Sequence, residues 1–128
     1  SFAIDATTNE EAYCPAVPVT AIDPTGAGDV FAASILLGTL AGWPLEVRLR
    51  FASLSASLSV RHFGGSLAAP GWGDIADWWR SVSGRAAEGD LRAAYVMRDY
   101  DFLAGLVPTH SLHAVRRAEG TFALASHL

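Results

Sequence analysis

The chain is organised around Asp23-Pro24-Thr25-Gly26-Ala27-Gly28-Asp29, which runs directly into Val30-Phe31-Ala32-Ala33. Its glycines predict a sharp turn, and the small and apolar residues after it predict a helix that begins there. The first amides of such a helix have no partner within the helix, and the helix dipole adds about half a positive charge. The stretch therefore predicts a helix start suited to a phosphate or another anion, with the carboxylate of Asp29 within reach of the bound group.

The same residue types also fit a plain helix cap. Asp and Thr are common just before a helix, and Asp29 in the first turn is favourable at the positive end of the dipole. The stretch alone is therefore consistent with either role, a helix cap or an anion-binding site, and only the flanking sequence can distinguish them.

Composition bounds the class of protein. The chain has 128 residues, 51% hydrophobic and 17% charged, enough for one modest domain with a core. Its net charge is −4, and its basic residues are nine scattered arginines without a lysine, so we expect no nucleic-acid partner. The single Cys14 cannot form an internal disulfide, and no secretory leader is recognisable, so we expect a cytoplasmic protein.

A membrane span is not expected either. The uncharged run between Asp29 and Glu46 is shorter than the roughly 20 residues a span needs, and glycines and Pro44 interrupt it. It predicts instead a helix buried on most of its sides in a protein core.

The remaining elements follow from periodicity and turn residues. Residues 1–12 predict a strand with a turn at 9–11, and residues 13–22 predict an extended edge strand, because Pro15 and Pro18 cannot donate to a ladder. Gly64-Gly65 is a strong helix stop. Helices are expected over residues 27–41, 45–63, 74–82, 88–106 and 112–127, the last with Ser111 as its cap.

Several familiar sites are excluded. A Walker-type phosphate loop needs a lysine, and a dinucleotide fingerprint needs a small residue where Phe31 stands. The nucleophile-elbow pattern beginning at Gly64-x-Ser66 lacks its last glycine. His110-x-x-His113 has no nearby cysteine, so satisfied or solvent-facing histidines explain it better than a metal site.

The Asp23–Asp29 stretch resembles, over its whole length, the second signature of the PfkB (ribokinase-like) carbohydrate kinases, in which Asp-Thr/Pro-Thr-Gly-Ala-Gly-Asp precedes a small, apolar helix. A Val-rich lead-in precedes it, and an Ala/Ser-rich helix and a Gly-Gly turn come after it, as in that family. The resemblance covers residues 1–82 and implies the C-terminal part of a three-layer α/β/α fold, mostly helical here. Residues 83–128 would be an additional helical tail without an assigned role.

The resemblance also implies an activity, ATP-dependent phosphorylation of a sugar or related small-molecule hydroxyl. Asp29 would be the general base that accepts the proton of the attacking hydroxyl. The amides of Gly26, Ala27 and Gly28 would stabilise the charge on the transferred phosphoryl group. ATP and Mg²⁺ are the implied cofactors, and K⁺ is used by some members.

Two further sets of residues are implied. The adenine side comprises Ser53, Val60 and Gly64. The monovalent-cation site comprises Asp23, Thr25, Phe63 and Gly65. Ser53 departs from the Asn or His often found at its position in the family.

Much of a complete kinase has no counterpart in this sequence. The N-terminal Gly-Gly signature, most of the sugar pocket and the Asn-x-x-Glu motif linked to magnesium are missing; Asn9 is the only asparagine, and position 12 is Ala. We therefore expect a C-terminal fragment that is inactive alone, with a sugar substrate and with either a second copy or the missing N-terminal portion as partner. A non-catalytic remnant or helical interaction module, and an anion-binding module unrelated to kinases, are the alternatives.

Overall fold

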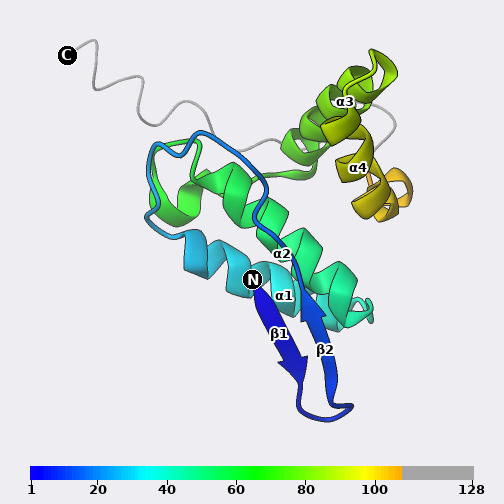
Figure 1. Ribbon diagram of the computed structural model, residues 1–128. Coiled ribbons are helices and arrows are strands. Elements are labelled where there is room, and N and C mark those ends of the chain that lie inside the picture. Colours follow the sequence, from blue (N-terminus) through cyan, green and yellow to red (C-terminus); the bar gives the residue numbers. More distant parts are fainter. Residues whose placement is uncertain (108–128) are drawn as a thin grey trace, which may run out of the picture. The chain divides into compact units, whose positions relative to one another are not determined.

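A computed structural model describes residues 1–107. These residues form two compact units, Ser1–Ala69 (the N-terminal unit) and residues 70–107 (the C-terminal unit). The elements in chain order, labelled in Figure 1, are β1 (Phe2–Asp5), β2 (Glu10–Tyr13), α1 (Ala27–Leu40), α2 (Leu45–Ser59), η1 (Gly65–Ala68), α3 (Trp72–Ala87), α4 (Leu91–Asp99) and η2 (Asp101–Gly105). The described chain is thus a mixed α/β structure. The two units do not coincide with the predicted division into residues 1–82 and 83–128, which concerned family resemblance rather than packing.

Strands β1 and β2 form an antiparallel hairpin in which Phe2 pairs with Tyr13. The turn lies at residues 6–9, where Asn9 adopts a left-handed conformation with φ of 58°. The Asp5 carboxylate holds the turn by accepting from the Thr7 amide at 2.9 Å. The expected turn at 9–11 is therefore wrong by two residues, because residues 10 and 11 already belong to β2.

Helix α1 agrees with its prediction to within one residue. It begins after Gly26 and ends at Leu40, just before Gly42, whose φ of 72° few residues other than glycine adopt. Helix α2 begins after Pro44 as expected, but it ends at Ser59 rather than at residue 63. The Val60 carbonyl accepts from two distant amides, so the chain leaves the helical path there.

Those two amides belong to Ile22 and Asp23, at 2.7 and 3.1 Å from the Val60 oxygen. They end the segment 14–22, which was predicted to be an edge strand and forms no strand in the structure. Its prolines supply no ladder donors, and the sheet in the described part of the chain consists of β1 and β2 alone. The segment instead runs back to the end of α2.

The core of the N-terminal unit lies between the hairpin and the two helices. Small side chains of the hairpin face inward, and larger ones on the helices meet them; the cluster comprises Ala12, Cys14, Leu45 and Leu49, with Ala3, Phe31 and Ile35 packed against it. The opposite face of the hairpin exposes Phe2, Ile4 and Tyr13. This alternation follows from the two-residue period of a strand.

Helix α1 is buried along one stripe only. Val30, Ser34 and Gly38, four residues apart, are buried, whereas an exposed face carries Leu36, Leu37 and Leu40. The prediction of a helix buried on most sides is therefore wrong for the described chain. The physical reason is that one helix and one hairpin can cover only one side of α1.

Glycine at position 38 sets how closely α1 approaches the turn and the helix that come after it. A Cβ there would lie 2.8 Å from Cγ of Arg48 and 3.0 Å from a ring carbon of Trp43. Trp43 in turn packs edge-on against Phe51, with ring centroids 5.2 Å apart. Residues 38, 43 and 48 thus form a close contact at the turn between α1 and α2.

The C-terminal unit contains α3, α4 and η2. Helix α3 extends on both sides of the predicted 74–82, with Asp74 accepting from the Gly71 amide at 2.8 Å. Of the helix expected over residues 88–106, only α4 (Leu91–Asp99) is α-helical, because the chain turns at Gly89 (φ 94°), Asp90 caps α4, and residues 101–105 form the separate 3₁₀ helix η2. Trp78 and Tyr100 meet edge-on at 5.4 Å.

None of the helices within residues 1–107 has the length and apolar character to cross a membrane. The helix expected over residues 112–127, its cap Ser111 and the pair His110 and His113 lie outside the described residues.

Candidate functional site

The glycine turn adopts the conformation that an anion-binding helix start requires. Gly26 precedes the first residue of α1 with φ of 77° and ψ of 0°, a left-handed conformation that glycine adopts at little cost. No side chain caps the helix there. The first amides of α1 therefore do not have the partner that a Ser, Asp or Asn cap would supply.

The backbone hydrogen bonds show which amides are engaged. The Ala27 amide donates to the Pro24 carbonyl at 3.2 Å, and the Val30 amide donates to the Gly26 carbonyl at 3.0 Å. Within residues 1–107, no hydrogen-bond acceptor is found for the amides of Gly26, Gly28 and Asp29. Of the three amides predicted to meet the phosphoryl group, those of Gly26 and Gly28 are thus available, and that of Ala27 is held by the turn.

Asp23 fixes the entry to the turn. One oxygen of its carboxylate accepts from the Thr25 amide at 3.0 Å. Hydrogen bonds from the Thr25 hydroxyl and amide, with a smaller contribution from the Gly64 amide, hold the pKa of Asp23 below its usual value. The Asp23 carboxylate therefore binds Thr25 within the turn and also interacts with the loop after α2.

That loop passes very close to the turn. A Cβ on Gly26 would lie 2.6 Å from the Ser66 nitrogen and 2.7 Å from the Gly65 carbonyl carbon, closer than real contacts allow. Gly65 has φ of 57°, and a Cβ built on it would lie 3.5 Å from the Thr25 methyl group and 3.8 Å from the Thr25 carbonyl oxygen. Two segments about 40 residues apart in sequence are thus in backbone contact, which the absence of a side chain at Gly26 permits.

Asp29 lies in the first turn of α1, with its side chain exposed. The hydroxyl of Ser66, in the first turn of η1, donates to Oδ2 of Asp29 at 3.5 Å. The sequence pattern around Ser66, an incomplete nucleophile elbow, does not indicate this contact. The two residues are 37 positions apart, and only the close approach of Gly26 to the loop brings them together.

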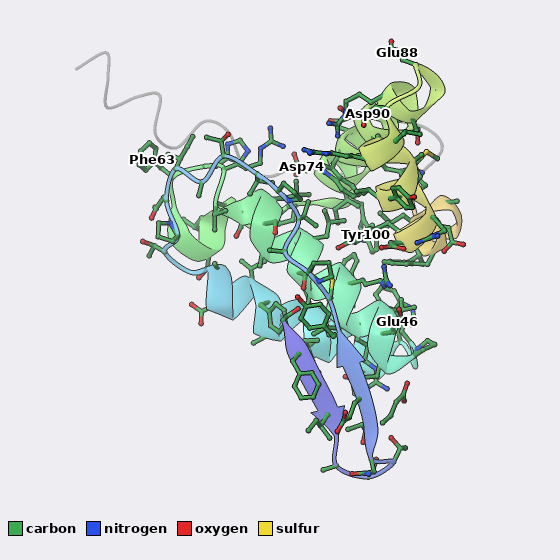
Figure 2. All side chains as sticks on the ribbon, in the orientation of Figure 1. Glu46, Phe63, Asp74, Glu88, Asp90 and Tyr100 are labelled. Atoms are coloured by element: carbon green, nitrogen blue, oxygen red, sulfur yellow. The ribbon has the colours of Figure 1, made fainter. Side chains whose placement is uncertain are left out.

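The residues predicted for the cation and the adenine divide into those at the contact between the turn and the loop and those elsewhere in the N-terminal unit. Asp23, Thr25, Gly64 and Gly65 are brought together with the turn, as described. Phe63 is exposed on the loop after α2, and Figure 2 shows it at the end of the N-terminal unit opposite Glu46.

The residues predicted for the adenine are engaged within the protein. Ser53 is buried, and its hydroxyl lies 2.7 Å from that of Ser1 at the start of the hairpin. The Val60 carbonyl accepts from the amides of Ile22 and Asp23. The third adenine position, Gly64, interacts through its amide with the Asp23 carboxylate of the glycine turn.

The site can hold an anion and accept a proton. Free amides and the helix dipole favour a negatively charged group near Gly26 and Gly28, and the Asp29 carboxylate is the adjacent acceptor. Among residues 1–107, no three His, Cys, Asp or Glu side chains gather in a way that could hold a metal ion.

Two comparisons with known proteins bear on this site. The sequence model of the pfkB family carbohydrate kinases matches residues 2–71, more than half of the chain. The protein named Ribokinase from Bacillus subtilis (strain 168) is 45% identical over 56 residues, which are 44% of this chain and 19% of that relative. The chain thus spans a small part of that relative's length. No solved structure matches the chain.

The matched residues include the whole glycine turn, α1, α2 and the loop that contacts the turn. The chain therefore belongs to the pfkB family of carbohydrate kinases.

Proposed function

We propose that this chain supplies the phosphoryl-stabilising turn and the general base of a kinase that transfers the γ-phosphate of ATP to a sugar hydroxyl. In the complete enzyme it would belong to the C-terminal part of a three-layer α/β/α fold. One observation carries the proposal: the unpartnered amides of Gly26 and Gly28 lie at the start of the helix whose first turn holds Asp29.

The chemistry follows from that juxtaposition. Asp29 would accept the proton of the sugar hydroxyl as its oxygen attacks the γ-phosphorus, and the bond to the ADP oxygen would break. The amides of Gly26 and Gly28 would donate to the phosphoryl oxygens, where negative charge develops. The Ala27 amide could join them by releasing its 3.2 Å bond to Pro24.

The proposal also includes the nucleotide and the cations. Ser53, Val60 and Gly64 would lie on the adenine side. A monovalent cation such as K⁺ would lie between the turn and the loop, where the Asp23 carboxylate interacts with Gly64 and the carbonyl of Thr25 lies near Gly65; Phe63 and Gly65 would add their carbonyls. Oxygen atoms of this kind suit K⁺. Mg²⁺ would arrive with ATP, and no residue of this chain is assigned to it.

The substrate class is a sugar, and the name of the Bacillus relative makes ribose the first substrate to test. The test uses a completed kinase: the full 128-residue chain joined to the portion of that ribokinase that precedes the matched segment. ATP-dependent phosphorylation of ribose is then measured.

Asp29→Asn should lower the rate of the completed kinase at least about 100-fold, since a general base typically contributes roughly 10²–10⁴-fold. The matched control is Glu46→Gln, an exposed carboxylate on α2 that pairs with Arg50, and it should leave the rate unchanged. A full rate in Asp29→Asn would show that the base assignment is wrong.

An interaction module is the second candidate, and the exposed apolar face of α1 favours it. Leu36, Leu37 and Leu40 are exposed there, together with Phe2 and Tyr13 on the hairpin. Titration of the chain alone with ATP and Mg²⁺ distinguishes the two candidates. Absence of binding, with a stable oligomer by light scattering, would favour the module.

A further inference from the structure

We infer that Ser66 is a positioning residue for Asp29, fixing the carboxylate oxygen that is not used for proton transfer. The inference rests on the proposed function, because Ser66 acts through the proposed base. Its starting point is the contact from the Ser66 hydroxyl to Oδ2 of Asp29, at 3.5 Å.

The place of Ser66 is set by backbone contacts and not by its own side chain. The Ser66 nitrogen and the Gly65 carbonyl carbon pack against Gly26, in the space that a Cβ at that position would occupy. The Gly64 amide interacts with the Asp23 carboxylate. These contacts hold the first turn of η1 beside the first turn of α1. The Ser66 hydroxyl therefore faces Asp29 from a fixed backbone.

The hydroxyl is free for this role. The Ser66 carbonyl accepts from the Ala69 amide within η1, so its backbone has a structural partner. Within the described chain, the hydroxyl itself contacts no hydrogen-bonding group other than Asp29. Nor is a basic side chain found paired with Asp29 among residues 1–107.

The contact matters because the Asp29 carboxylate is exposed and otherwise free to rotate. A donor on Oδ2 selects one orientation and leaves Oδ1 to face a substrate hydroxyl. At 3.5 Å the bond is long, and catalytic hydrogen bonds in ligand-free sites often shorten only when substrate binds. Ser66 would thus reduce the rotational freedom that Asp29 loses on reaching the transition state.

The test uses the completed kinase with Ser66→Ala and Ser66→Thr. Ser66→Ala should lower kcat about three- to tenfold, the value of one hydrogen bond, while KM for ATP changes less than about twofold. Ser66→Thr keeps the hydroxyl and should restore most of kcat. Ser81→Ala, which removes an exposed hydroxyl from α3, is the matched control and should leave both constants unchanged.

A second measurement uses the 128-residue chain itself and needs no activity. The ¹³C chemical shift of the Asp29 carboxylate should move in Ser66→Ala and return in Ser66→Thr, while the backbone amide shifts of α2 stay in place. That result would separate loss of the hydrogen bond from a general loss of structure.

The outcomes are distinct. An unchanged kcat in Ser66→Ala, beside an inactive Asp29→Asn, would overturn the role of Ser66 and leave the proposed function standing. A lowered kcat that Ser66→Thr does not restore would also overturn it, because the hydroxyl would then not be the cause. Full activity in Asp29→Asn would overturn both.

Discussion

Replacing Gly26 with Ala tests whether the glycine turn and the loop after α2 are in contact as described. Two separate costs apply at this position. The residue has φ of 77°, and a left-handed conformation costs a non-glycine residue about 1–2 kcal/mol. The new Cβ would also lie 2.6–3.0 Å from three atoms of the Gly65–Ser66 backbone, which cannot move aside as a flexible side chain would.

Overpacking of this kind costs about 1–3 kcal/mol, so the total for Gly26→Ala is about 2–5 kcal/mol. Two glycines of the same unit provide controls. Gly42 has φ of 72° with nothing within 4 Å of an added Cβ, so Gly42→Ala should cost only the conformational 1–2 kcal/mol, an approximate range. Gly28 lies in α1 with open space around it, so Gly28→Ala should be neutral or stabilising by up to about 1 kcal/mol.

The assay is equilibrium unfolding in urea, followed by pulsed hydrogen exchange and mass spectrometry on peptides from Ser1–Ala69. This readout reports the free energy of unfolding of the N-terminal unit separately. With a slope of about 1–3 kcal/mol per molar urea, a loss of about 3 kcal/mol shifts the midpoint by about 1 M or more. If Gly26→Ala costs no more than Gly42→Ala, the loop does not contact the turn, and the inference about Ser66 loses its basis.

Two more predictions concern packing and pH. Gly38→Ala should destabilise the N-terminal unit by about 1 kcal/mol, because the added Cβ would meet Arg48 and Trp43. Gly84→Ala, in open space on α3, is the control and should stabilise the protein by up to about 1 kcal/mol. Thermal melts in which Gly38→Ala is the more stable variant would contradict the packing of α1. The folded-state pKa of Asp23 is lowered, so the charged form stabilises the fold above about pH 4, and this stability is lost as the pH falls through the lowered pKa. Asp23→Asn should therefore flatten the dependence of the urea midpoint on pH below about 4, and an unchanged dependence would count against the turn geometry.

The sequence predicted the local features of the glycine turn well. The bounds of α1 follow from Gly26 before it and Gly42 after it, and Pro44 places the start of α2. These signals are local, because each depends on the conformations that one residue can adopt. The family assignment rests on the same stretch and is confirmed by the match over residues 2–71.

The errors arise where distant segments meet. The sequence predicts an end of α2 four residues too late and a strand over residues 14–22 that does not form, because neither the helical nor the strand pattern shows that Val60 accepts from Ile22 and Asp23. Ser66 was missed for the same reason, since its partner lies 37 residues away. The exposed face of α1 was predicted to be buried because composition reports how apolar a helix is, and not whether the described chain contains anything to cover it.

The double use of the Val60 carbonyl has a consequence for how the site opens. The Ile22 and Asp23 amides share this one acceptor, and Val60 is the first residue after α2. Their protons can exchange with solvent only when that junction separates, so the two amides should become unprotected in the same opening event. Fraying of the last turn of α2 would thus release the lead-in to the glycine turn, and the order of the proposed phosphoryl site depends on a helix end that does not itself contain Asp29.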